Sequence, residues 1–557
     1  MAKKTHLTLS LFVLLLLLFC SCTRKTSGIE DALASITAED LKKDVKILSS
    51  DEFEGRSPAS KGEELTIEFL KNEFQALGLK PGNNDSFFQE VPLVKITSEP
   101  SRTLEILGPN ASKKFQYGDE FVSTTMRFVD EVSLENSEMI YVGYGIVAPE
   151  YNWNDYEGID VKGKTVVIQV NDPGFTTQDP DLFNGRAMTY YGRWTYKYEE
   201  AARQGAAGAL IIHETEPAAY GWDVVHNGWT GPQFLMESPD NNMSRCAVEG
   251  WITLQTTQAI FKQAGLDFNG LKTEAAQIGF SAINMGLKAN LTLSNTIEHS
   301  RSHNVIALLP GSERPEELII YMAHWDHFAP DPNLEGDQIF NGALDNATGT
   351  AALIELAEAF LKLETPPARS IAFLAVTAEE QGLLGSKYYA ANPIYPLTNT
   401  VASINMDSLN IYGRMKDITV IGFGQSELDD YVVDEAAAQN RTVMPDPKPE
   451  RGSFYRSDHF PFAKQGVPAL YTSMGVDHVE HGKEWTLAKR DEYIKNNYHK
   501  PSDEYDPNWD LSGAIEDLQL LFKIGYRLSM ESTFPNWKEG SEFKAKRDAD
   551  MAEINKK

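Results

Sequence analysis

The sequence predicts an α/β fold: a mostly parallel sheet sandwiched by helices, with an inserted, mostly-β domain. From about Asn304 onward, strand-like and helix-like runs alternate along the chain. Such alternation requires crossover connections, which give a largely parallel sheet covered on both faces. Between about Val91 and Phe280, short β-rich runs alternate instead with Gly, Pro and Asn. At 557 residues the chain exceeds one ordinary domain, so we expect these two regions to fold as separate units.

The elements follow the chain in a simple order. Helical spacing begins at an S/T-x-x-D/E cap formed by Thr37 and Asp40 and predicts helix to about Leu79. In the middle region, one helix-like piece leads into a β-rich run (Tyr196–Gly205 and Gly208–His213). In the last region we expect the strands Leu318–Ala323, Ser370–Thr377, Val401–Met406, Ile418–Gly422 and Ala469–Ser473, and the helices Gly349–Leu363, Glu427–Ala438 and Leu511–Met530.

The first 22 residues form a separate targeting unit. Lys3 and Lys4 precede the apolar run Leu7–Phe19, which suits a signal-peptide core and falls short of the roughly 20 residues that span a bilayer. Ser21 before Cys22 resembles a bacterial lipobox, although Phe19 stands where such motifs usually carry Leu. We therefore expect an exported, periplasmic or outer-membrane-tethered lipoprotein anchored at Cys22, with simple cleavage and release as the alternative.

Composition narrows the class of partner. The 80 acidic residues against 51 basic ones give a formal net charge of −29, which argues against nucleic acid because phosphates need a basic surface. If Cys22 is acylated, only Cys246 remains, so the fold depends on no disulfide. The membrane is expected as a partner only through the lipid anchor, and the sequence does not give the oligomeric state.

Ionisable side chains follow three of the predicted strands. His324 and Asp326 follow the first, Glu379 and Glu380 the second, and Asp407 the third. In a parallel sheet, ligands bind outside the carboxyl ends of the strands. Each residue alone has an ordinary structural interpretation, but imidazoles and carboxylates together at one edge suit zinc.

Two further positions extend this group. Asp345 lies in a Gly-flanked loop just before a predicted helix, where it could also be an N-cap. His499 lies in a loop before the last long helix, where it could be a surface residue.

Five segments now resemble the co-catalytic zinc exopeptidases, the family that includes bacterial leucyl aminopeptidases and glutamate carboxypeptidases. They read HxD from His324, NGALDNATG from Asn341, EEQGLLGS from Glu379, NMD from Asn405 and YHKPSDEYD from Tyr498. Segments 48–55 (LSSDEFEG) and 78–91 (GLKPGNNDSFFQEV) resemble the N-terminal portion of these enzymes. Residues 201–209 resemble part of a protease-associated domain inserted into the catalytic domain.

The resemblance implies two Zn²⁺ per chain. His324 and Asp407 would bind one zinc, His499 and Glu380 the other, and Asp345 would bridge them. Asp326 would orient His324.

The same resemblance gives Glu379 a catalytic role. Glu379 would be the general base that takes a proton from the water between the metals and passes it to the leaving amine. Tyr455, Arg456 and Asp458 lie in another family-like segment and are tentative substrate-binding residues, with ordinary packing as the equal alternative.

The expected domain boundaries follow from these segments. They are a signal peptide at 1–22, the N-terminal part of the peptidase domain at 23–95, the inserted protease-associated domain at 96–290, the catalytic peptidase domain at 291–535 and a charged tail at 536–557.

We expect an exopeptidase acting on peptides, and an aminopeptidase first. Carboxypeptidase or glutaminyl-cyclase chemistry on the same scaffold is the alternative, and a non-enzymatic binding protein fits less well because every ligand position is filled. An aminopeptidase must bind the ammonium group of its substrate, and Glu379 and Asp458 are candidates for this. A carboxypeptidase must bind a carboxylate, and Arg456 is a candidate for that. The sequence contains no G-x-S-x-G motif, which argues against a serine hydrolase.

Overall fold

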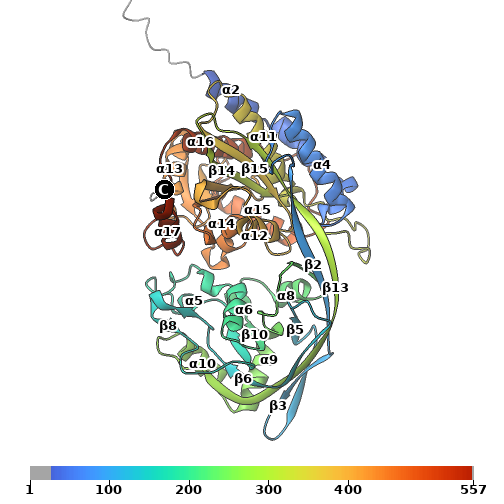
Figure 1. The fold of residues 1–557 in the computed structure, drawn as a ribbon. Helices are drawn as coiled ribbons and strands as arrows, with labels where there is room; N and C mark the ends of the chain where they lie inside the picture. The colour runs from blue at the N-terminus through green and yellow to red at the C-terminus, as the bar shows by residue number, and fades with distance from the viewer. Residues whose placement is uncertain (1–26, 555–557) are drawn as a thin grey trace, which may run out of the picture.

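The computed structural model describes residues 27–554, which form two lobes stacked one above the other (Figure 1). The expected signal segment and Cys22 lie outside the described residues. Within the described part of the chain, no helix combines the length and apolarity needed to cross a membrane.

The upper lobe is built on a mostly parallel sheet. Its four central strands are parallel and adjacent in the order β15 (Arg369–Val376), β14 (Arg314–His324), β16 (Thr400–Asn405) and β19 (Ala469–Met474). The long strand β13 (Ile283–Leu309) pairs antiparallel with β15 at one side. At the other side β17 (Asp417–Val420) pairs antiparallel with β19 and parallel with β18 (Thr442–Pro445). The predicted mostly parallel sheet is therefore confirmed.

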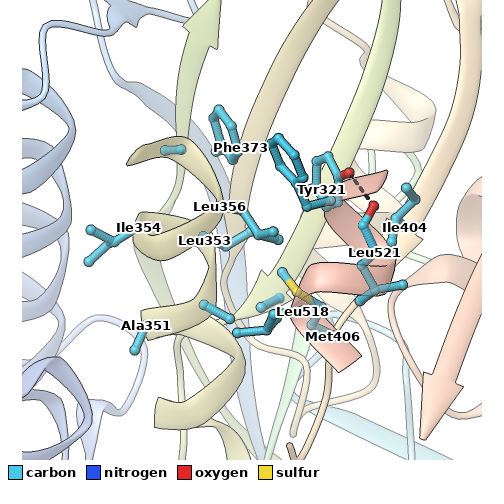
Figure 2. Close-up of a cluster of buried hydrophobic side chains, with 14 of the residues drawn as sticks. Tyr321, Ala351, Leu353, Ile354, Leu356, Phe373, Ile404, Met406, Leu518 and Leu521 are labelled. Carbon is cyan, nitrogen blue, oxygen red and sulfur yellow. Dashed lines mark hydrogen bonds between the residues drawn. The ribbon is translucent and has the colours of Figure 1, made fainter. Parts of the chain in front are cut away.

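Both faces of this sheet are buried, as the apolar strands predict. Along β14, Tyr321 belongs to the hydrophobic cluster beneath α11 (Thr348–Leu361) and α16 (Ser512–Met530). Its neighbours Ile320 and Met322 belong to the cluster on the opposite face. Figure 2 shows the first cluster, where the Tyr321 hydroxyl donates a 2.7 Å hydrogen bond to the Leu521 carbonyl in α16. Helices α12 (Leu384–Ala391) and α14 (His459–Lys464) supply the opposite cluster with Tyr389 and Phe462.

The N-terminal helical region is interrupted, which corrects the expectation of helix from Thr37 to Leu79. The Thr37 cap is present, since its hydroxyl accepts from the Asp40 amide at 3.1 Å. The helix that follows this cap ends at Leu48, and the chain then turns at Glu54 and Gly55, both at positive φ. A Cβ on Gly55 would lie 2.2 Å from the Phe328 carbonyl oxygen. The observed elements are α2 (Ser27–Ser35), α3 (Ala38–Leu48), η1 (Asp51–Arg56) and α4 (Lys61–Ala76).

The lower lobe has its own sheet and hydrophobic clusters. Parallel strands β6 (Glu131–Tyr141), β9 (Thr165–Gln169), β10 (Gly208–His213) and β12 (Val248–Thr253) lie side by side, and β5 (Phe121–Thr124) pairs antiparallel with β12. Helices pack beside these strands, so the region mixes helix and strand. They are α5 (Pro173–Thr177), α6 (Trp194–Arg203), α7 (Thr215–Ala218), α8 (Trp222–Trp229), α9 (Leu254–Ala264) and α10 (Phe268–Ala275). The remaining strands are β3 (Thr103–Leu107), β4 (Ser112–Gln116), β7 (Val147–Ala148), β8 (Trp153–Asn154) and β11 (Pro232–Met236).

Two long strands join the lobes. β2 (Phe88–Pro100) pairs antiparallel with β13 over most of its length, and together they run down one side of the molecule (Figure 1). The expected boundaries after residues 95 and 290 fall inside these strands. The connection between the lobes is therefore a hydrogen-bonded ribbon.

The C-terminal segment, expected as a charged tail, is packed against the upper lobe. Trp537 is buried and its Nε1 donates to the Gly466 carbonyl at 3.0 Å. In α17 (Lys544–Ile554), Arg547 donates to the Thr400 carbonyl at 3.1 Å. The upper lobe is completed by β1 (Lys80–Pro81), α13 (Leu428–Ala438) and α15 (Gly482–Asn496).

Candidate metal centre

The five predicted ligand residues meet at the carboxyl edge of the upper sheet. His324 is the last residue of β14, Glu380 follows β15, and Asp407 follows β16. Asp345 lies in the turn before α11, and His499 in the loop between α15 and α16. Three parallel strands and two loops therefore deliver residues more than 170 positions apart to one place.

Asp345 lies between the two histidines. Its Oδ1 is 3.3 Å from His324 Nε2, and its Oδ2 is 3.3 Å from His499 Nε2. His324 Nε2 also lies 3.7 Å from Asp407 Oδ1, and His499 Nε2 lies 3.2 Å from Glu380 Oε2. Each histidine thus faces one oxygen of the shared Asp345 carboxylate and one oxygen of a second carboxylate, which is Asp407 for His324 and Glu380 for His499.

These separations fit metal ligands better than hydrogen bonds. Two ligand atoms about 2.0–2.1 Å from a tetrahedral zinc lie roughly 3.3 Å apart. The Nε2 atoms of His324 and His499 are buried and have no hydrogen-bond partner within the described residues. An unpartnered buried nitrogen is costly unless something else binds it. The residues therefore fit a pair of metal ions sharing Asp345.

His327 is a further member of the centre that the sequence analysis missed. It is fully buried, its Nδ1 lies 2.6 Å from Glu380 Oε1, and its Nε2 has no partner among the described residues. Ligand atoms of His327, Asp345 and Glu380 all lie within 4.8 Å of one another. The sequence does show a second histidine three positions after His324. The expectation that ligands follow directly at strand ends does not single it out.

Asp326 positions both glutamates. Its buried carboxylate accepts from the backbone amides of Glu379 at 3.0 Å and Glu380 at 3.4 Å. His324 Nδ1 is 3.1 Å from the Asp326 carbonyl oxygen and 3.8 Å from its carboxylate. The backbone carbonyl therefore orients the His324 ring, and the carboxylate fixes the strand end that carries Glu379.

Two buried charges outside the predicted set hold the Asp345 loop. The Asp503 carboxylate accepts from the amides of Leu344 and Asp345, each at 3.1 Å. The Arg56 guanidinium donates to the carbonyls of Trp325 at 2.8 Å and Gly342 at 2.9 Å. Arg56 therefore connects the His324 strand end to the Asp345 loop.

Burial and charge set the protonation of the carboxylates. Burial raises the pKa of Glu379 well above its ordinary value, and the neighbouring charge of Glu380 adds to this against the pull of His324. Burial also acts to raise the pKa of Glu380, but His499 and His327 together outweigh it and leave that pKa at about 2. A bound cation would favour the charged form of Glu379 as well. One glutamate is therefore held as an anion, while its neighbour is poised to hold a proton.

The tentative substrate residues divide into two groups. Tyr455 is buried and its hydroxyl donates to Glu542 at 3.1 Å, and Asp458 is fully buried and accepts from the Ser386 hydroxyl at 2.6 Å. Each of these two side chains therefore has a structural partner, and its part in substrate binding stays a prediction. Arg456 is exposed.

The fold and these side chains define a carboxylate- and imidazole-lined metal centre at the ligand-binding edge of an α/β sheet. Comparison with known proteins gives the family it resembles. Residues 304–522 match the model of peptidase family M28, and this stretch contains all five predicted ligand positions.

Several curated relatives match parts of the chain. A probable zinc metalloprotease of Leptosphaeria maculans is 34% identical over 129 residues, 22% of this chain and 29% of the relative. The mouse aminopeptidase NAALADL1 is 33% identical over 127 residues, 22% of this chain and 16% of the relative. A glutamate carboxypeptidase 2 homolog of Caenorhabditis elegans is 30% identical over 208 residues, 35% of this chain and 24% of the relative. The chain thus spans less than a third of each relative.

A solved structure matches over nearly the whole chain. The aminopeptidase from Aneurinibacillus sp. strain AM-1 aligns with a TM-score of 0.50 and 20% identity, covering 91% of this chain and 97% of that one. At this identity the match shows the fold, and it agrees with the predicted sheet flanked by helices.

Proposed function

We propose that the protein is a metal-dependent exopeptidase, an aminopeptidase that holds two zinc ions per chain. The observation that carries the proposal is the placement of Asp345, whose two oxygens each lie 3.3 Å from a different unpartnered histidine nitrogen. The match of residues 304–522 to peptidase family M28 supports it.

The ligand assignment follows the distances. His324 and Asp407 would hold one zinc, His499 and Glu380 the other, and Asp345 both. When bound, such a pair of ions lowers the pKa of water and polarises the scissile carbonyl. Negative charge on three of the five ligands partly offsets the charge of the two cations.

Glu379 is the proton carrier in this proposal. Its carboxylate is grouped with His324 and Glu380 within 4.8 Å, and Asp326 fixes its backbone. A carboxylate with a raised pKa takes a proton during attack and can return it to the leaving amine.

The proposal also covers the lower lobe and the N-terminal signal peptide. The Tyr190 ring from the lower lobe lies 5.0 Å from Phe460 of the upper lobe, so the lower lobe packs near the segment carrying Arg456. We propose that this lobe is a protease-associated insert that shapes access to the centre. Export and lipid anchoring at Cys22 are part of the same proposal.

A screen of peptides with free and blocked termini tests the activity. We expect hydrolysis of peptides with a free amino terminus, loss of activity with a chelator, and recovery with zinc. Hydrolysis that requires a free carboxyl terminus and tolerates a blocked amino terminus would show a carboxypeptidase instead. Cyclisation of an amino-terminal glutamine would show a glutaminyl cyclase, and the absence of chelator-sensitive turnover a binding protein.

The Glu379→Gln variant tests the proposed base. We expect turnover to fall by at least about a hundredfold, because general acid–base catalysis contributes roughly 10²–10⁴. Metal content should stay near two per chain, measured by mass spectrometry of the metals. Full activity in this variant would remove Glu379 from the mechanism.

A further inference from the structure

A cavity of about 680 Å³ lies in the lower lobe. Its lining residues all fall between 175 and 272, so none of them belongs to the upper lobe that carries the candidate metal centre. Small-molecule sites in proteins have volumes of roughly 300–1,000 Å³. The cavity is therefore large enough for a ligand and is separate from the proposed zinc ligands.

The cavity lies at the carboxyl edge of the parallel strands of the lower lobe. His213 is the last residue of β10, Thr253 is the last residue of β12, and both line the cavity. Phe175 of α5, the helix that follows the neighbouring strand β9, lines it as well. Ligands bind outside the carboxyl ends of parallel strands, which is also where the upper lobe places its metal ligands. The lower lobe thus has a ligand-binding edge of its own.

Part of the cavity wall is apolar and held in place. Trp222 Nε1 donates to the Gly118 carbonyl at 2.9 Å, so this side chain offers a ligand the carbon surface of its indole ring. The His213 ring packs edge-on against Trp222, with ring centroids 5.6 Å apart. Phe175 and Leu254 are half-buried and add further apolar surface. This wall favours a ligand that carries an apolar group.

Three other lining groups accept hydrogen bonds. His213 is 5% exposed, and its Nε2 lies 3.1 Å from the Tyr220 carbonyl oxygen. Because a carbonyl only accepts, Nε2 carries the proton, and burial lowers the pKa of the ring and so favours its neutral form. Nδ1 is then an acceptor, and it has no partner among residues 27–554. With the carboxylates of Glu214 and Glu216 in the same wall, these acceptors favour a positively charged donor.

Donors that favour an anion lie in the same cavity. Lys272 of α10 places its Nζ 2.6 Å from both carboxylate oxygens of Glu214. α9 begins at the cavity with Leu254 and Gln255, whose amides have no acceptor inside the helix. The Thr253 hydroxyl caps the third amide of α9 and does not pair with these two. An ammonium group and the first turn of an 11-residue helix together favour a carboxylate.

We propose that this cavity binds a short zwitterionic peptide, with its free ammonium group at the acceptors and its free carboxylate at Lys272 and the start of α9. The apolar wall takes a hydrophobic side chain of the same peptide, and about two or three residues match the size of the cavity. A phosphate would meet the carboxylates of Glu214 and Glu216, and an uncharged ligand would leave Lys272 and the α9 amides unused. The proposal goes beyond the peptidase function and does not require it.

Three related peptides test the two charges of the ligand. Phe-Leu has both termini free, N-acetyl-Phe-Leu lacks the ammonium group, and Phe-Leu-amide lacks the carboxylate. Each is titrated calorimetrically into full-length Glu379→Gln protein, first zinc-loaded and then after chelation, so that neither hydrolysis nor binding to zinc accounts for a signal that persists in both states. We expect Phe-Leu to bind one such site per chain with a Kd roughly in the micromolar to millimolar range. Both capped peptides should bind at least about tenfold more weakly, because hydrogen bonds to charged groups contribute at that level.

Substitutions in the cavity locate the binding site. Lys272→Met should weaken Phe-Leu binding about tenfold and should remove the difference between Phe-Leu and Phe-Leu-amide, because it deletes the cation that meets the carboxylate. Lys262→Met is the matched control, since Lys262 is exposed near the other end of α9 and does not line the cavity. The control should keep the native affinity.

A second substitution keeps the test valid if the Lys272 variant fails to fold. Glu216 is exposed, and Glu216→Gln should weaken Phe-Leu binding by up to about fivefold and leave N-acetyl-Phe-Leu unaffected. Its matched control is Glu274→Gln, since Glu274 is exposed on α10 and does not line the cavity.

The outcomes separate this site from the proposed activity. The proposed site is overturned if Phe-Leu shows no saturable binding at roughly 10 mM, if the capped peptides bind as well as Phe-Leu, or if both cavity variants keep the native affinity. Hydrolysis by the zinc-loaded native protein alongside any of these results leaves the peptidase proposal intact. Binding that Lys272→Met weakens, in a protein that hydrolyses no peptide, supports the cavity and removes only the peptidase proposal.

Discussion

Removing the Asp503 carboxylate should weaken metal binding more than it weakens the fold. Asp503 is 2% exposed and is not a proposed ligand, but it accepts from the backbone amides of Leu344 and Asp345 at 3.1 Å. It also accepts from the Tyr493 hydroxyl at 3.0 Å. Asp503→Ala therefore removes the acceptors that fix the backbone of the bridging residue.

The magnitudes decide which measurement is informative. Each buried amide left without a partner costs about 1–3 kcal/mol, so the two together cost about 2–6 kcal/mol. The substitution also relieves the burial of a carboxylate whose pKa is raised to about 6, which returns about 3 kcal/mol at neutral pH. The net destabilisation should be small, between about −1 and about 3 kcal/mol. Loss of a partner that orients a metal ligand typically costs about 10–100-fold in metal affinity.

The assay is zinc competition against a chelator, with thermal unfolding measured in parallel. We expect both zinc affinities to fall, because Asp345 faces both histidines. Asp506→Ala is the matched control, since Asp506 is exposed three positions away and accepts only within its own turn. If the Asp503→Ala variant is folded and keeps native zinc affinity at both sites, Asp345 does not depend on the Asp503 carboxylate for its position.

Three further predictions test other parts of the structure. Asp345→Ala should reduce zinc loading at both sites at least about tenfold by metal analysis. A variant that still holds two zinc ions tightly would contradict the proposal that Asp345 is shared by both sites. Burial raises the pKa of Glu355 from 4.5 to about 8, so the folded state keeps a proton that the unfolded state releases, and stability falls as pH rises between these values. Glu355→Gln should match the native protein in urea unfolding near pH 4.5 and exceed it by several kcal/mol at pH 8; equal stability at both would refute this. Cys22→Ala should move the protein from the membrane fraction to the soluble fraction; continued membrane association would show another anchor.

The central strands could be predicted from sequence because they are buried on both faces. β14, β15 and β16 are continuous apolar runs, and their observed bounds differ from the expected ones by a few residues. β13 was not predicted as one strand because its middle is largely exposed and its partners change along its length. The break at Glu54 and Gly55 depends on contact with Phe328, which helical spacing cannot reveal.

The candidate site likewise contains residues that the sequence predicts and residues that it does not. The five ligand positions follow strand ends and motifs, so sequence patterns select them. His327, Arg56 and Asp503 act through contacts with residues far along the chain, such as the Arg56 bond to the Gly342 carbonyl.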